Sequence, residues 1–159
     1  MLRNFLLLLS FLALLLFVRS RMQHWMESKQ VVAFEFLKTE AAAQSLLSAP
    51  EWQTGASDGL SDRLRQNTYW DFLFIVAYTG VLFFLARVML GDTHRYMPAI
   101  ARLLLIAGLA DAVENVCILQ ILNGARGWFP ASMSSLAAIK FAMLLLAVGV
   151  MVTGLLKKR

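Results

Sequence analysis

Four long apolar segments dominate this sequence, and they leave the chain few possible folds. The segments cover about residues 2–18, 69–90, 99–122 and 132–156. A helix crosses the hydrocarbon core of a bilayer with roughly 20 apolar residues, and about 17 are enough. Of the 159 residues, 59% are hydrophobic and only 16% are charged, too few charges to cover a water-soluble domain of this size. We therefore predict an all-α integral membrane protein, a four-helix up-down bundle that forms a single membrane domain over residues 1–159.

The first apolar segment has two interpretations. An apolar run that follows a positive residue, here Arg3, is typical of a secretory signal peptide. However, Arg19, Ser20 and Arg21 stand where a small-residue cleavage site would follow. At about 1.5 Å per residue, the segment is just long enough to span a bilayer. We expect a retained membrane anchor.

Residues 22–68 form the extended polar region of the chain, between the first two spans. Helical spacing predicts a helix with an imperfect apolar stripe, because Val31 and Phe34 fall on the other side. The stripe consists of Trp25, Met26, Val32, Phe36, Ala43 and Leu47. Because apolar residues occur on more than one face, we expect this short extramembrane helical segment to lie against the membrane or another protein.

A turn-rich run follows this segment and separates it from the second span. It begins at Pro50 and continues through the small and polar residues up to Gly59. Ser61 is then a candidate N-cap, with Asp62 in the first turn. From there one uninterrupted helix is expected to run to Leu90.

The basic residues lie at the ends of the apolar segments, which bears on partners and on orientation. The net charge is +5, and basic residues in such places meet lipid headgroups and set the topology. We therefore expect the lipid bilayer, and no nucleic acid, as a partner. Counting basic residues in short loops favours both termini in the cytoplasm and residues 22–68 in the periplasm or outside, although Arg19 and Arg21 count against it. The expected location is the bacterial inner (plasma) membrane.

The third apolar segment carries an ordered set of polar residues at its centre. At 100° per residue, Asp111, Glu114 and Asn115 share a face about 100° wide with small residues. A charge at the centre of a bilayer costs roughly 2.5–3.5 kcal/mol unless it is paired, neutralised or hydrated. The fourth segment offers one interior charge, Lys140, at a depth within about 1–2 Å of Glu114. We predict a Glu114–Lys140 ion pair, with Asp111 and Asn115 completing the hydrogen bonds.

The second apolar segment adds Asp71 and Tyr78 to this buried polar cluster. Seven residues apart, they lie on nearly the same face of a helix, so a polar path could run inward from Asp71 through Tyr78. An alternative is that Asp71 only ends the span near water. The predicted cluster therefore contains six residues: Asp71, Tyr78, Asp111, Glu114, Asn115 and Lys140.

Few kinds of chemistry are open to this sequence. The single cysteine, Cys117, excludes an intrachain disulfide, and His24 and His94 are expected on opposite sides of the membrane. We therefore expect no metal site and no cofactor. No nucleophile elbow, zinc-protease motif, phosphate-binding loop or dinucleotide fingerprint occurs. Paired carboxylates can act as acid and base, so Asp111 and Glu114 are the candidate catalytic residues if the protein is an enzyme.

Three functions are compatible with these features. Small residues cover one face of the fourth segment, including Ala138, Ala142 and Gly149, and such faces let membrane helices approach closely. We therefore expect a non-catalytic structural or partner-binding subunit of a membrane assembly, bound to another membrane protein or forming a homo-oligomer. The alternatives are a small membrane enzyme that acts on a lipid-like substrate, and a component that handles protons or ions.

Overall fold

The computed structural model describes residues 2–25, 28–37, 39–48, 59–125, 127 and 129–157. Within these ranges all regular structure is α-helical, in the order α1 (Leu2–Trp25), α2 (Ser28–Glu35), α3 (Glu40–Ser48), α4 (Leu60–Leu90), α5 (Met97–Leu122) and α6 (Phe129–Leu156). Four of these helices, α1, α4, α5 and α6, are long and apolar enough to cross a membrane. This confirms the predicted helical class and the four long apolar helices.

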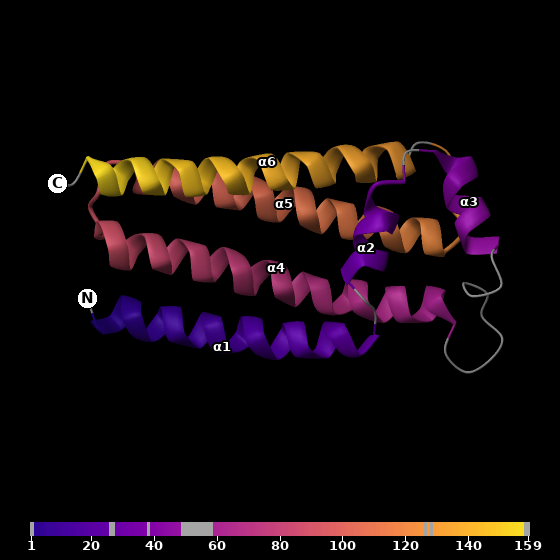
Figure 1. Ribbon diagram of the computed structural model, residues 1–159, viewed down its shortest axis with the longest axis horizontal. Helices are drawn as coiled ribbons and strands as arrows, with labels where there is room; N and C mark the ends of the chain where they lie inside the picture. Colours follow the sequence, from indigo (N-terminus) through magenta and orange to yellow (C-terminus); the bar gives the residue numbers. More distant parts are fainter. Residues whose placement is uncertain are drawn as a thin grey trace.

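The four long helices lie side by side, and both chain termini are at the same end of the molecule (Figure 1). Helix α1 packs against α4, α4 against α5, and α5 against α6. The two short helices pack against α6. They lie toward the end of the molecule away from the termini (Figure 1). This arrangement leaves α1 and α6 as the outer members of the row.

Two apolar clusters hold the helices together, one toward each end. The cluster near α3 contains Phe34, Ala43, Leu64, Cys117, Ile118, Ile121 and Met133. The cluster near the termini contains Ala86, Leu90, Met97, Ile100, Leu104 and Ala147. Between them lies a level at which the buried side chains are polar, so a polar cluster lies in the middle of an otherwise apolar core.

Helix α1 is attached to α4 by close packing at Gly80. A Cβ atom at this position would overlap the ring of Phe11, so only glycine allows the two helices to approach this closely. The Phe11 ring also stacks on Phe84, with 5.5 Å between ring centroids. The glycine therefore determines how near α1 lies to the rest of the protein.

A polar contact fixes the first turn of α1. Asn4 is buried and its Nδ2 donates to Asp92 Oδ1 over 2.6 Å, in the turn between α4 and α5. Arg87 Nε donates to the same oxygen, also over 2.6 Å. This hydrogen bond from Arg87 holds the pKa of Asp92 below its ordinary value. The start of α1 is thus tied to the turn that joins the next two helices.

The helix boundaries differ from the predicted ones by a few residues. Helix α1 continues beyond the predicted span to Trp25, and α5 and α6 begin two to three residues early, at Met97 and Phe129. The N-cap of α4 is Gly59 rather than Ser61, so that prediction was wrong by two residues. The predicted turn-rich run from Pro50 lies outside the described residues as far as Asp58.

The continuous stripe predicted across residues 25–47 was wrong. Two helices occupy this region, because Thr39 caps the second: its Oγ1 accepts a hydrogen bond from the Ala42 amide over 3.2 Å. The buried face also differs, since Phe34 is buried whereas Val32 and Phe36 are exposed. With a break between the helices, the stripe cannot form one face. Of its other members, Ala43 is buried, Met26 lies outside the described residues, and the side chains of Trp25 and Leu47 are likewise not described.

Candidate functional site

Three charged residues of the long helices meet at one level of the molecule. Each lies eleven residues from the end of its helix nearest α3: Asp71 after Leu60, Asp111 before Leu122, and Lys140 after Phe129. At about 1.5 Å per residue, this places them roughly 16 Å from that end. Equal offsets on three neighbouring helices explain why residues far apart in sequence form one cluster.

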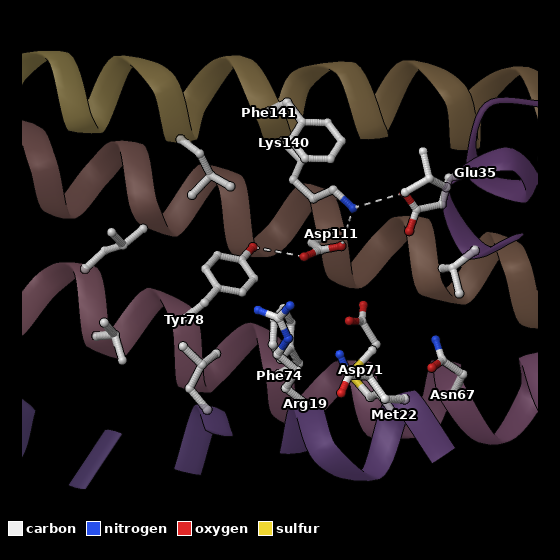
Figure 2. Close-up of a pocket in the computed structure, with 17 residues that line it drawn as sticks. Arg19, Met22, Glu35, Asn67, Asp71, Phe74, Tyr78, Asp111, Lys140 and Phe141 are labelled. Carbon is white, nitrogen blue, oxygen red and sulfur yellow. Dashed lines mark hydrogen bonds and ion pairs between the residues drawn. The ribbon is translucent and has the colours of Figure 1, made fainter. Parts of the chain in front are cut away.

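Lys140 is the centre of this cluster (Figure 2). Its Nζ donates to Asp111 Oδ1 over 2.9 Å and lies 2.9 Å from Glu114 Oε2. Asp111 and Glu114 are three residues apart, so they share one face of α5 and a single ammonium group reaches both. The predicted contact between Glu114 and Lys140 is present, and Asp111 is a second, better aligned partner.

Glu114 is the most deeply buried member of the cluster. It is 0% exposed, yet neither of its carboxylate oxygens has an aligned hydrogen-bond donor among the described residues. The short distance to Lys140 is therefore an ion pair without hydrogen-bond geometry. A buried acceptor without a donor costs about 1–3 kcal/mol. The attraction between the charges of Glu114 and Lys140 is thus the contact that offsets this cost.

The other predicted members form two further hydrogen bonds between α4 and α5. The hydroxyl of Tyr78 donates to Asp111 Oδ2 over 2.9 Å, and Asn115 Nδ2 donates to Asp71 Oδ2 over 2.8 Å. The six predicted residues are therefore brought together. Asn115 donates its hydrogen bond to Asp71 and not to the Glu114–Lys140 pair, which differs from the predicted arrangement.

Glu35, at the end of α2, is a seventh member of the cluster that was not predicted. Its Oε2 lies 3.8 Å from Lys140 Nζ, and the residue is 8% exposed. Burial raises the pKa of Glu35 above its ordinary value, and the attraction of Lys140 only partly opposes this. The sequence carried one signal: Phe34 falls outside the predicted stripe, and the face that contains Phe34 is the one that packs inward.

A cavity of about 490 Å³ opens beside the cluster (Figure 2). Residues of α1, α2, α4, α5 and α6 line it, and they include Glu35, Asp71, Tyr78, Asp111 and Lys140. Glu114 is not among the lining residues. The polar side chains thus occupy one part of the wall.

The rest of the cavity wall is apolar. Toward the end of the molecule that holds the termini, it is formed by Leu15, Val81, Leu82 and Leu144. The cavity therefore has a charged end near α2 and an apolar end that extends along the long helices, as an amphipathic molecule would require.

The cavity reaches the surface beside α1, α2 and α6. Arg19 of α1, Val32 of α2 and Phe141 of α6 all line it and are exposed. Arg19, which was used above to judge orientation and the retention of the first segment, lies on the α1 side of the cavity (Figure 2).

Metal chemistry has no support in the described part of the chain. No group of three or more His, Cys, Asp or Glu residues is placed there to hold a metal ion. His94 lies in the turn between α4 and α5 and His24 near the end of α1, so neither joins the cluster. Cys117 is buried in the apolar cluster near α3.

Only some of the carboxylates are free to meet a bound molecule. Both oxygens of Asp111 are engaged, one by Lys140 and one by Tyr78. Asp71 uses one oxygen to accept from Asn115, and among the described residues Glu35 has a long contact with Lys140. Asp71 and Glu35 are therefore the carboxylates that can contact a molecule in the cavity. The predicted catalytic candidates Asp111 and Glu114 mainly bind Lys140.

Comparisons with protein-family models, with curated proteins and with solved structures gave no match to this chain. The cavity and the residues that form it are therefore the features that bear on function.

Proposed function

We propose that this chain is an integral membrane protein whose lateral cavity binds one lipid-like amphiphile. The observation that carries the proposal is the cavity itself. Its volume of about 490 Å³ lies within the roughly 300–1,000 Å³ of typical ligand pockets, and its wall combines one charged end with one apolar end. An amphiphile satisfies both ends at once, with its head at the level of Lys140 and its tail beside Leu144.

Exposed apolar surface supports the membrane location. Large hydrophobic side chains point outward from every long helix, for example Leu6, Val76, Leu105 and Leu145, which are 52–73% exposed. A water-soluble protein rarely leaves such continuous apolar surface uncovered. With lipid around them, α1, α4, α5 and α6 would be four spans in an up-down bundle, and both termini would lie on one side, which we propose is the cytoplasm.

Labelling of single cysteines tests this topology. With Cys117→Ala as background, Ser45→Cys in α3 and Arg95→Cys in the α4–α5 turn should react with a membrane-impermeant maleimide from opposite sides. Intact cells should label position 45, and position 95 should react only after permeabilisation. Labelling of both positions in intact cells would contradict four spans.

The other functions considered from the sequence have less support. A path for protons across the membrane would need polar groups beyond Tyr78, but the described wall there is formed by Val81, Leu82 and Leu144. Acid–base catalysis by Asp111 and Glu114 would need both to reach the substrate, and Glu114 does not line the cavity. A partner-binding role remains a prediction from the small-residue face of α6.

Native mass spectrometry of protein extracted with its own lipids tests the binding function. We expect one retained amphiphile per chain. The variant Leu144→Trp fills the apolar end of the cavity and should lose it. The adjacent Leu145→Trp is a matched control, because Leu145 is 73% exposed and does not line the cavity.

Two results would overturn the binding proposal. One is wild-type protein that retains no amphiphile under conditions in which it stays folded. The other is equal retention by Leu144→Trp and Leu145→Trp. Thermal unfolding of both variants verifies that the tryptophan at position 144 removes the ligand without removing the fold.

A further inference from the structure

The charged end of the cavity contains more acidic than basic groups. Glu35, Asp71 and Asp111 line it, and the bases that line it are Lys140 and Arg19. Glu114 lies directly behind Lys140 and adds a fourth carboxylate to the group. Four carboxylates against two cations leave a formal charge of two negative when all are ionised.

The charge of Lys140 is already shared among three carboxylates. Its Nζ lies 2.9 Å from Asp111 and from Glu114 and 3.8 Å from Glu35. An anionic head placed beside it would compete with these carboxylates for one positive charge.

Two acceptors, by contrast, have room for a further donor within the described part of the chain. Asp71 Oδ2 accepts from Asn115, and its carboxylate lines the cavity. Glu35 is more than nine-tenths buried and lines the same end, but its cationic partner stays at 3.8 Å, too far for a hydrogen bond. Figure 2 shows both side chains at the α2 end of the cavity, on opposite walls.

We propose that the cavity selects amphiphiles with a cationic amine head, held between Asp71 and Glu35, and discriminates against anionic heads. This inference rests on the proposed binding function. An ammonium group placed there donates to the two unsaturated carboxylates and offsets the excess negative charge. A carboxylate or phosphate head meets the same carboxylates as a like charge in a site shielded from water.

Arg19 does not reverse this preference. It is exposed, whereas Asp111 and Glu35 are buried, and charges act on one another more strongly at buried positions.

Three probes with the same tail separate the contributions of head and tail: dodecylamine, dodecanol and dodecanoate. Binding to the full chain in phosphatidylcholine nanodiscs is measured by native mass spectrometry at pH 7, with each probe at equal mole fraction in the lipid. We expect dodecylamine to bind about tenfold more tightly than dodecanol, as one charge-assisted hydrogen bond would give. Dodecanoate should bind most weakly.

Two variants test whether the named carboxylates cause the preference. Asp71→Asn and Glu35→Gln should each reduce the ratio of amine to alcohol affinity toward one. Asp62→Asn is the matched control, because Asp62 is exposed in the first turn of the same helix as Asp71 and does not line the cavity. It should leave the ratio unchanged.

The possible results separate this inference from the proposed function. Binding of none of the three probes, or binding that Leu144→Trp does not weaken, would overturn the proposed function. Binding of dodecanol or dodecanoate at least as tightly as dodecylamine would overturn only the choice of head. A preference for the amine that survives both Asp71→Asn and Glu35→Gln would also contradict the inference, because the selectivity would then arise elsewhere.

Discussion

Replacement of Lys140 by methionine should be the most damaging single change in the buried polar cluster. The substitution keeps most of the side-chain volume but removes the cation shared by Asp111 and Glu114, which are 3% and 0% exposed. Breaking one side of a buried pair costs about 3–5 kcal/mol, because the remaining charge has no partner. Two carboxylates lose a contact at 2.9 Å here, so we expect the upper part of that range.

Replacement of Glu114 by glutamine should cost less. Lys140 keeps its hydrogen bond to Asp111, and Glu114 has no aligned donor to lose. We expect a loss of about 1–2 kcal/mol, as for an ordinary buried hydrogen-bonding group. The two single variants should therefore differ clearly in stability.

Combined variants show how many carboxylates share the lysine. In an isolated ion pair, the double variant Lys140→Met/Glu114→Gln would recover most of the stability lost. Here Asp111 still lacks its cation, so we expect only partial recovery, with a coupling energy of roughly 1–3 kcal/mol. Adding Asp111→Asn should bring the free energy of unfolding nearer to that of the wild type.

The measurement is the free energy of unfolding by denaturant in detergent micelles, followed by tryptophan fluorescence. Arg102→Met is the control, because Arg102 is an exposed cation on α5, and its loss should change stability by no more than about 0.5 kcal/mol. The reasoning is refuted if Lys140→Met matches this control. Full recovery in the double variant would show that Asp111 does not depend on Lys140.

Three further predictions follow from the packing and from Glu35. Gly80→Leu should destabilise the protein by about 1–3 kcal/mol, because its side chain would overlap Phe11, whereas Gly149→Leu should be tolerated in open space; unfolding measurements compare the two. Burial raises the pKa of Glu35, so its ionisation opposes folding as pH rises; Glu35→Gln should therefore raise the unfolding temperature at pH 8 and not at pH 4. Protonation of Glu35 should also weaken dodecylamine binding as pH falls, and an affinity independent of pH would contradict this.

Much of the fold was predictable because length and apolarity alone determine which segments can span a bilayer. The contact between the polar residues of α5 and Lys140 could also be predicted, because the rise per residue of a helix gives the depth of each residue along its span. Glu35 could not be placed in this way. Its position depends on the break that Thr39 caps and on the burial of Phe34, both of which depend on contacts with other helices.

The cavity itself was also beyond the sequence. It exists because α1 packs on α4 and α6 on α5, which leaves a space between the outer helices. Periodicity shows which residues share a face of one helix, but not how far apart two helices stand. For that reason Arg19 had no predicted place at a cavity.

The apolar helices around the cavity determine how a ligand would be supplied. In the proposed membrane setting, a molecule would enter from the surrounding lipid, where each buried methylene group contributes about 0.8 kcal/mol to its retention. Occupancy then depends on the mole fraction of the ligand among the lipids, and its concentration in water matters little. At a fixed amount of ligand, added empty vesicles would lower the occupancy of the cavity, although the contacts at Asp71 and Glu35 stay the same. The composition of the membrane would thus act on this protein as directly as any change in its own residues.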